Sequence, residues 1–324
     1  MSRTRLAIGA SIAIVASPAM LLGAIGLMHS VRVSSQSPPT VPKATVAGFR
    51  NPAHAILGVF ELGVPASFGP VQKFGRDVHH NPDLVVLFVG VGRRFPTAFA
   101  KTARSHGASL LIQINPGKIP LRTIASGAYD GWLRGYAHQV AMFGHPVVIG
   151  FAHEMNGYWY PWGYTQQPPA AFVAAWRHIV TVFRRQGADG AIWLWTLSHD
   201  SKHTGPPRAY WPGSRYVDWV GIDGYYYHRS DTFGFVFGRK LRQVRKITND
   251  PVLLSEVGIG QIAGKARKIP GLIAGITGNH LAGLVWFDLA QHDGIYRQDW
   301  RLEGHPAAIA AFRQGLDRLL AHHR

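Results

Sequence analysis

The 324-residue sequence contains no cysteine, which excludes disulfide bonds, thiolate metal sites and a cysteine nucleophile. Acidic residues are also scarce, with 17 Asp and Glu against 34 Lys and Arg, and the formal net charge is +17. Glutamate occurs only at positions 61, 154, 256 and 303. Two glutamates in matching sequence contexts therefore carry more weight here than they would in a glutamate-rich protein.

Several functional motifs are absent as well. No Gly-x-Ser-x-Gly segment joins a strand-like run to a helix-like one, which argues against a serine hydrolase of that type. The His and Asp residues are not spaced as metal ligands, and there is no continuous basic run or nucleic-acid motif. We therefore expect no cofactor, no metal and no nucleic-acid partner. An outward-facing surface of this charge would instead attract an anionic membrane surface or acidic cell-wall polymers.

The amino terminus differs in character from the rest of the chain. Two arginines precede an uncharged apolar run from Leu6 to Met28, so residues 1–29 are predicted to be a signal peptide or, given the length of the run, an uncleaved signal anchor. Residues 30–53, rich in Ser, Pro and Thr, are predicted to be a linker. The expected location is extracytoplasmic, either membrane-anchored or secreted, and the functional domain is expected to span residues 54–324.

The full sequence is 47% hydrophobic. In the predicted domain, apolar runs alternate with helix-like stretches such as Pro169–Gln186 and Thr232–Thr248. The eight runs are Ala55–Phe60, Leu84–Val89, Ser109–Ile114, Val147–Ala152, Ala191–Thr196, Val217–Ile222, Val252–Ser255 and Leu281–Phe287. This alternation predicts an α/β fold built from parallel βα units. Because no phosphate-binding glycine fingerprint follows the first run, a closed (β/α)₈ TIM barrel is favoured over a doubly wound open sheet.

Two of the glutamates follow or end such runs in matching contexts. In Pro146–Gly163 an apolar strand-like run leads to His153-Glu154 and then to an aromatic cluster, and Pro251–Gly258 repeats the pattern of proline, apolar run, glutamate (Glu256) and glycine. Each glutamate could simply cap a following helix. The matched pair, with aromatic residues beside one member, favours a reactive site at the carboxyl ends of the fourth and seventh barrel strands, nearly across the mouth from each other.

Paired carboxyl groups of this kind are the machinery of glycoside hydrolysis. One carboxylic acid protonates the leaving oxygen while the other attacks the anomeric carbon, and water later hydrolyses the glycosyl-enzyme. Aromatic rings beside the pair can stack on the apolar faces of sugars. The arrangement therefore predicts a retaining glycosidase.

The motifs also resemble a known family. His153–Gly157 followed by Trp159–Gly163 is similar to the acid/base strand of glycoside hydrolase family 26, which consists mainly of β-mannanases of the retaining (β/α)₈ clan. Three further stretches agree in order and approximate spacing: Tyr216–Tyr225, Pro251–Gly258, and Trp286-Phe287 with Asp299–Arg301 beyond it. The likeness covers essentially the whole domain.

The resemblance implies a role for each matching residue. Glu154 would be the general acid/base and Glu256 the nucleophile. The substrate-binding residues would be His153, Trp159, Trp162, Asp223, Tyr225 and Trp286. In particular, Tyr225 would hydrogen-bond Glu256, while Trp159 and Trp286 would stack on sugars flanking the cleaved bond.

Two positions depart from the family pattern and bear on the substrate. Gly150 stands where many relatives carry Arg, and Gln113 with Asn115 end the third strand where mannanases have His. The expected function is an endo-acting β-glycosidase on a β-1,4-linked polysaccharide, with mannan first. The alternatives are a β-glucan, xylan or exopolysaccharide hydrolase of the same fold, or a non-catalytic carbohydrate-binding wall protein.

Overall fold

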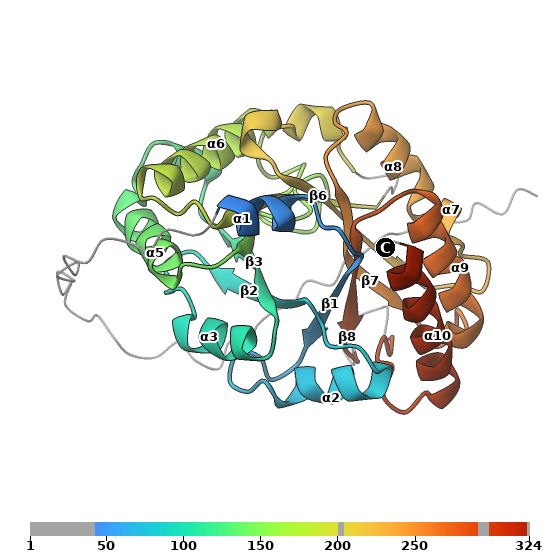
Figure 1. The fold of residues 1–324 in the computed structure, drawn as a ribbon. Helices are drawn as coiled ribbons and strands as arrows, with labels where there is room; N and C mark the ends of the chain where they lie inside the picture. The colour runs from blue at the N-terminus through green and yellow to red at the C-terminus, as the bar shows by residue number, and fades with distance from the viewer. Residues whose placement is uncertain (1–42, 200–203, 291–297, 323–324) are drawn as a thin grey trace, which may run out of the picture.

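The computed structural model describes residues 43–199, 204–290 and 298–322, and these form a closed barrel of eight parallel strands in sequential order (Figure 1). The strands are β1 Ile56–Glu61, β2 Leu84–Gly90, β3 Ser109–Asn115, β4 Val147–Phe151, β5 Ala191–Ser198, β6 Trp219–Tyr226, β7 Val252–Ile259 and β8 Gly283–Asp288. Each coincides with one of the eight predicted runs to within a few residues. The predicted TIM barrel is confirmed.

Helices surround the barrel on its outer side (Figure 1). The α-helices are α1 Lys43–Arg50, α2 Gly69–Val78, α3 Thr97–Ser105, α4 Leu121–Ala125, α5 Asp130–Phe143, α6 Pro169–Arg185, α7 Phe233–Val236, α8 Gly238–Arg245, α9 Lys265–Gly278 and α10 Pro306–His322, with 3₁₀ turns η1 Pro207–Tyr210 and η2 Ser214–Tyr216 between β5 and β6. The single helix predicted over Thr232–Thr248 is instead two, α7 and α8, separated at Phe237.

Helix α6 shows how the sequence specifies such an outer helix. It begins at Pro169, where proline is tolerated because an N–H in the first turn has no hydrogen-bond partner within the helix. It ends with two arginines, whose positive charges interact favourably with the negative end of the helix dipole. The buried residues recur at helical spacing along one face: Phe172, Ala175, Trp176, Ile179, Val180, Val182 and Phe183. The helix therefore packs on the barrel through that apolar face.

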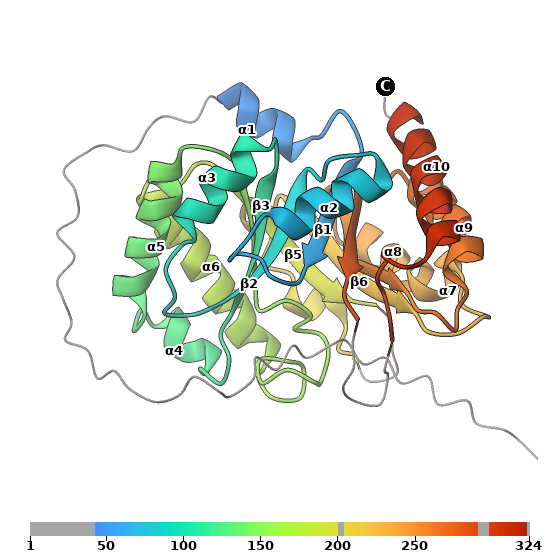
Figure 2. The same cartoon turned by 90° about the horizontal axis from the view of Figure 1, so that it is seen from below.

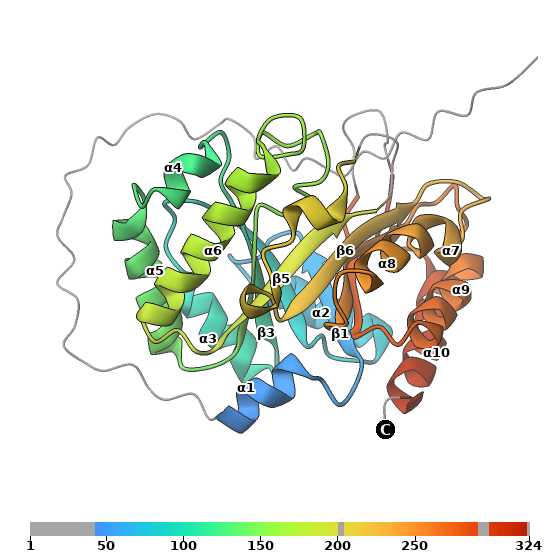
Figure 3. The same ribbon diagram turned by 90° about the horizontal axis from the view of Figure 1, so that it is seen from above.

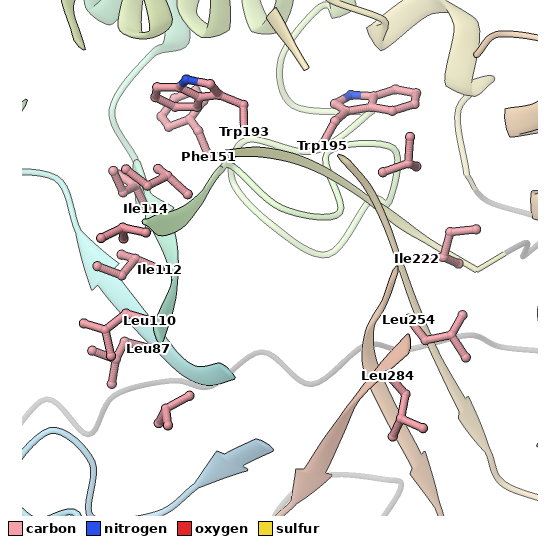
Figure 4. Packing of buried hydrophobic residues seen from close by; sticks show 14 of the residues in the cluster. Leu87, Leu110, Ile112, Ile114, Phe151, Trp193, Trp195, Ile222, Leu254 and Leu284 are labelled. Atoms are coloured by element: carbon pink, nitrogen blue, oxygen red, sulfur yellow. The ribbon is translucent and has the colours of Figure 1, made fainter. Parts of the chain in front are cut away.

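Strand residues alternate between two hydrophobic cores. One core fills the barrel interior and the other lies between the strands and the helices. On β5, for example, Ile192 and Leu194 face inward, whereas Trp193 and Trp195 face the helical layer (Figure 4). The sequence predicted outward packing for at least one of these tryptophans, and both adopt it.

Helix α1 covers the amino-terminal end of the barrel. Phe49 stacks on Trp219 with ring centroids 5.9 Å apart, Trp219 Nε1 donates to the Arg50 carbonyl at 2.8 Å, and Arg50 pairs with Asp218 at 3.0 Å. Phe49 and Arg50 belong to residues 30–53, which were predicted to be a linker. Packing of the domain therefore begins upstream of the expected boundary at residue 54, because an aromatic residue and an arginine find partners on the barrel that the local sequence does not reveal.

The two ends of the barrel are distinct. Figures 2 and 3 show α1 and the carboxyl-terminal end of α10 at one end, and the loop that follows β4 at the other. Among the residues that the structure describes, no helix is both long and apolar enough to cross a membrane. The predicted signal segment, residues 1–29, lies outside the described part of the chain.

Candidate active site

Glu154 is positioned by an unusual backbone at the end of β4. Ala152 and Glu154 both have positive φ angles, 48° and 53°, which side chains other than glycine adopt only at a cost in free energy. The Ala152 amide donates to the Ile114 carbonyl on β3, and the Glu154 amide donates to the Thr196 carbonyl on β5. These two bonds compensate the strain and hold Glu154 fully buried at the mouth of the barrel.

Glu256 is positioned by a β-bulge. Between Leu254 and Val257 the pairing register of β7 shifts against β8, and a shift also occurs against β6. The extra residue places Ser255 and Glu256 on the inner side together, where strict alternation would send one of them outward. Ser255 Oγ then donates to Asp223 Oδ1 at 2.5 Å, and Glu256 reaches the same site as Glu154.

The electrostatics show that the two glutamates interact. Burial raises the pKa of Glu256 to about 8, the Glu154 carboxylate adds to the rise, and the hydroxyl of Tyr225 opposes it by donating to Glu256 Oε2 at 2.6 Å. Burial together with the carboxylates of Glu256 and Glu154 also raises the pKa of Asp223 well above its usual range. Three carboxyl groups therefore share one water-poor region of the barrel mouth.

The loop after β4 brings an aromatic ring onto Glu154. Trp159 Nε1 donates to Glu154 Oε2 at 2.8 Å. The ring lies flat over Gly157, where a Cβ would come within 2.6 Å of three ring atoms. Only glycine at position 157 leaves room for this arrangement, so the motif glycine fixes the tryptophan that holds the carboxylate.

The same loop is tied to its neighbours by hydrogen bonds. The Asn156 side chain exchanges two bonds with the backbone of Ser198 at 3.2 and 2.9 Å, and the Gly205 amide donates to the Asn156 carbonyl at 2.7 Å. The Tyr164 amide donates to the Gly157 carbonyl at 2.7 Å. A long irregular loop is thereby held as a rigid support for the site.

The site geometry agrees with the family to which the sequence is similar. The model of glycosyl hydrolase family 26 matches residues 132–305, which include both glutamates and the whole loop after β4. The chain belongs to glycosyl hydrolase family 26. The resemblance carried by the sequence motifs is therefore confirmed, and the domain is a glycoside hydrolase by family.

Two characterised relatives are similar in sequence to this family 26 chain. Endoglucanase H of Acetivibrio thermocellus is 28% identical over 272 residues, which cover 79% of this chain and 30% of that protein. The mannan endo-1,4-beta-mannosidase A and B of Caldalkalibacillus mannanilyticus is 32% identical over 90 residues, 26% of this chain and 17% of that protein. The aligned region thus spans less than a third of either relative's length.

Solved structures of the family share the fold. The catalytic domain of an endo-beta-1,4-mannanase from Bacillus sp. JAMB-750 superposes with a TM-score of 0.66 at 14% identity, covering 86% of this chain and 90% of that one. An endo-beta-1,4-mannanase double mutant from Cellulomonas fimi also superposes with a TM-score of 0.66 at 14% identity, covering 87% of this chain and 76% of that one. At these identities the likeness concerns the fold alone.

His153, whose predicted contact with substrate stays a prediction, has both ring nitrogens engaged by neighbouring side chains. It is 2% exposed, and its ring nitrogens contact Asn115 Oδ1 and the Tyr160 hydroxyl, each at 3.0 Å. Burial lowers the pKa of His153 to about 3, so the ring is neutral. The side chain of Tyr160 is more exposed than His153 and lies near the glutamates, which contribute to the rise of its pKa. The sequence analysis did not assign a role to Tyr160, although it follows the His-Glu motif in the aromatic cluster.

Trp286, which was expected to stack on a sugar, lies on the outer side of β8, away from the two glutamates. Its ring is fully buried between β8 and the helices, 5.0 Å from the ring of Phe312 on α10. Its Nε1 donates to Asp288 Oδ1 and to the Trp300 carbonyl. Its neighbour Phe287 faces the barrel interior instead. This placement follows strand alternation, because Leu284, two residues earlier on β8, also faces the helices.

Trp162 and Asp223 lie behind the site rather than on its surface. Trp162 is 4% exposed, stacks on Tyr160 at 4.3 Å and donates to the His153 carbonyl at 2.8 Å. Asp223 is fully buried and is paired in register with Glu256 on the neighbouring strand. Trp162 supports the backbone of His153, and Asp223 accepts from Ser255 beside Glu256. The predicted contacts of Trp162 and Asp223 with substrate stay predictions. Tyr225 donates to Glu256, as expected, and Trp159 donates to Glu154. The predicted stacking of Trp159 on a sugar stays a prediction.

An interior aromatic group completes the mouth on the side of β8. It consists of Phe60, Phe287, Tyr225, Tyr227 and Trp300. The ring of Trp300 lies 4.8 Å from that of Tyr225, close to Gly258, where a Cβ would meet it at 3.0 Å. Within the described residues, no group of three or more His, Asp or Glu side chains is placed to hold a metal ion.

Proposed function

We propose that this domain is a retaining, endo-acting β-glycosidase that cleaves a β-1,4-linked polysaccharide, with mannan as the first candidate substrate. The observation that carries the proposal is the convergence of Glu154 from β4 and Glu256 from β7 on one buried site, where the Glu154 carboxylate raises the pKa of Glu256. Two carboxyl groups acting on one glycosidic bond are what retaining hydrolysis requires.

The surrounding contacts support a division of labour between the glutamates. Glu154 donates its proton to the glycosidic oxygen while the Glu256 carboxylate attacks the anomeric carbon, and the leaving chain departs with that proton. Water, deprotonated by Glu154, then attacks the same carbon and releases Glu256. The Tyr225 hydroxyl stabilises the charged form of Glu256, and Trp159 fixes the orientation of Glu154.

β-Glucan is the second candidate substrate. The similarity to endoglucanase H extends over 272 residues, whereas the similarity to the mannan-cleaving relative extends over 90. The names of both relatives describe endo-acting enzymes, which supports endo action here. Gln113 and Gly150, which depart from the family pattern, lie in the barrel interior, where a Cβ at Gly150 would overlap the Gln113 amide. Xylan and exopolysaccharide remain further alternatives for the substrate.

The test is hydrolysis of a panel of mannan, β-glucan and xylan, followed as new reducing ends. We expect one polysaccharide to be cleaved, and Glu154→Ala and Glu256→Ala each to lower kcat by about four orders of magnitude. Glu303→Ala is the matched control, because this exposed glutamate pairs only with Lys73 among the described residues. It should leave kcat unchanged.

Two outcomes would contradict the proposal. Binding of a polysaccharide with no new reducing ends, equal in wild type and both variants, would make the domain a carbohydrate-binding protein. Products released with inverted anomeric configuration, seen by NMR at early times, would exclude the retaining mechanism.

A further inference from the structure

Basic side chains gather at the amino-terminal end of the barrel, the end opposite the active site. They lie on α1, at the ends of α6 and α8, and in the 3₁₀ turns before β6. We call this group the basic face and define it as Arg50, Arg184, Arg185, Arg208, Arg215, Arg245 and Lys246. All are exposed except Arg50, which is partly exposed. The acidic residues among them are Asp189, Asp218 and Asp250.

Contacts between these residues show that they form one continuous surface. Arg50 pairs with Asp218 at 3.0 Å. Burial raises the pKa of Asp218, and Arg184 lies close enough to oppose that rise. Arg184 also donates to the Arg215 carbonyl at 2.6 Å. The surface therefore extends from α1 across the start of β6 to the end of α6.

The surface continues to α8. Arg208 donates to the Lys246 carbonyl at 2.5 Å, and Arg245 donates to the Asp250 carbonyl at 2.8 Å. Asp218 and Asp250 are each only partly exposed. Within the basic face and its three neighbouring carboxylates, seven cationic groups leave a net charge of about +4.

The position of α1 indicates what this face meets. The chain enters the domain there, and upstream the sequence carries the uncharged apolar run Leu6–Met28. Residues 29–42 separate that run from α1 and can span at most about 50 Å when fully extended. If the run is held in lipid, the tether joins the barrel at the end that bears the basic face.

We propose that the basic face docks on anionic lipid headgroups, so that the mouth of the barrel points away from the membrane. Cationic side chains are attracted to an anionic bilayer surface within a Debye length, and the attraction adds to whatever anchoring the apolar run provides. Docking in this orientation leaves the mouth open to a long polysaccharide. The proposal does not depend on the chemistry of the active site.

The full chain offers matched reporters for a test. Lys246 lies on the basic face, whereas Lys118 follows β3 at the mouth, and both are exposed. The full chain would be reconstituted into vesicles of phosphatidylcholine alone or with phosphatidylglycerol, and labelled with a water-soluble amine reagent. On anionic vesicles we expect labelling of Lys246 to fall at least about fivefold relative to Lys118, and on neutral vesicles we expect no such fall. In about 1 M salt the labelling of Lys246 should recover, because the Debye length is then only about 3 Å.

Two charge-reversed variants separate the face from the overall charge. Arg185→Glu with Arg215→Glu should abolish the protection of Lys246, whereas Arg93→Glu with Arg94→Glu at the mouth, with the same change in net charge, should retain it. All four arginines are exposed, and no hydrogen bond or ion pair of their side chains occurs among the described residues. Thermal unfolding of each variant checks that the domain is intact.

Several results would overturn the proposal. One is equal protection of Lys246 on neutral and anionic vesicles, and another is protection of Lys118 instead of Lys246. The others are loss of Lys246 protection in both charge-reversed variants and failure of the chain to associate with either kind of vesicle. Protection of Lys246 by soluble polygalacturonate but not by anionic vesicles would assign the face to acidic polysaccharide. None of these readouts requires hydrolysis, so a failure here is distinct from a failure of the proposed enzymatic activity.

Discussion

At the scale of single residues, the charge on Glu256 depends on Tyr225. Burial and the Glu154 carboxylate both favour the protonated form of Glu256, which cannot attack an anomeric carbon. The Tyr225 hydroxyl is the contact that counteracts them, at 2.6 Å. Because the pKa of Glu256 is raised to about 8, the attacking carboxylate becomes the main form only as the pH rises through that value.

Tyr225→Phe should therefore move the pH dependence of kcat/KM. A hydrogen bond to a charged group contributes about 1.5–3 kcal/mol, so its loss should shift the acidic limb of the pH profile of kcat/KM upward by about one to two pH units. At pH 7, kcat/KM should therefore fall by about ten- to a hundredfold. Kinetics between pH 5 and 10 on the cleaved polysaccharide would measure this.

Tyr226→Phe is the matched control for that experiment. Tyr226 is the next residue of β6, but its ring faces the helices, 6.3 Å from Phe237. Its hydroxyl has no hydrogen-bond partner among the described residues. We expect an unchanged pH profile. An equal shift in both variants would show that loss of a buried hydroxyl, rather than the bond to Glu256, moves the limb.

At the scale of elements, two backbone irregularities bring the glutamates together. The positive φ angles after β4 direct Glu154 into the mouth, and the bulge in β7 adds Glu256 to the inner side. A regular barrel strand would carry Ser255 and Glu256 on opposite sides. The loop after β4 then adds Trp159, whose position depends on the lack of a side chain at Gly157.

Gly157→Ala should displace Trp159 and weaken its bond to Glu154. A Cβ at this position would lie 2.3–2.6 Å from three ring atoms, so the ring has to move. Because misplacement of a catalytic group by about 1 Å can cost about a hundredfold, we expect kcat to fall by about ten- to a hundredfold with little change in thermal stability. Steady-state kinetics and the melting temperature would check both.

Gly205→Ala provides a control of the same kind. Gly205 lies between β5 and η1, and a Cβ there would lie 2.6 Å from the ring of Tyr164 on the loop after β4, not against Trp159. We expect kcat within about threefold of wild type. A comparable loss in both variants would mean that general disturbance of the loop, and not the Trp159–Glu154 contact, limits the reaction.

At the scale of the whole molecule, buried carboxyl groups couple stability to pH. Burial and the neighbouring Asp288 raise the pKa of Glu61 to about 9, and that of Glu256 is raised to about 8. Glu61 and Asp288 are paired in register at the ends of β1 and β8. The folded protein thus holds protons that the unfolded chain releases above about pH 4.5, so the free energy of unfolding falls as the pH rises from about 4.5 to 9.

Glu61→Gln should remove part of this dependence. At pH 4, where both states largely keep the proton, we expect little change. At pH 9 the variant should be more stable than wild type by up to about 6 kcal/mol. Urea denaturation at a series of pH values would measure the slope. Asp189→Asn, at an exposed carboxylate that does not contribute to the pKa shift of Glu61, is the control and should follow the wild type. A Glu61→Gln curve parallel to wild type would show that Glu61 does not hold its proton.

The sequence by itself determined the alternation of eight strands and helices, the pairing of Glu154 with Glu256, and the family. These follow from periodicity and from motifs that are local in the chain, and all eight strand runs were predicted to within a few residues. The location of residues 1–29 and their role stay predictions.

Only the tertiary structure decided which side chains face the mouth. Trp286 faces α10, His153 is covered by Tyr160, and α1 closes the barrel end, because strand parity, a bulge and contacts between distant segments set these positions. A bulge changes side-chain parity by one residue, and no local pattern of apolar residues records it. The basic face likewise exists only because folding brings α1, α6 and α8 to the same end of the barrel.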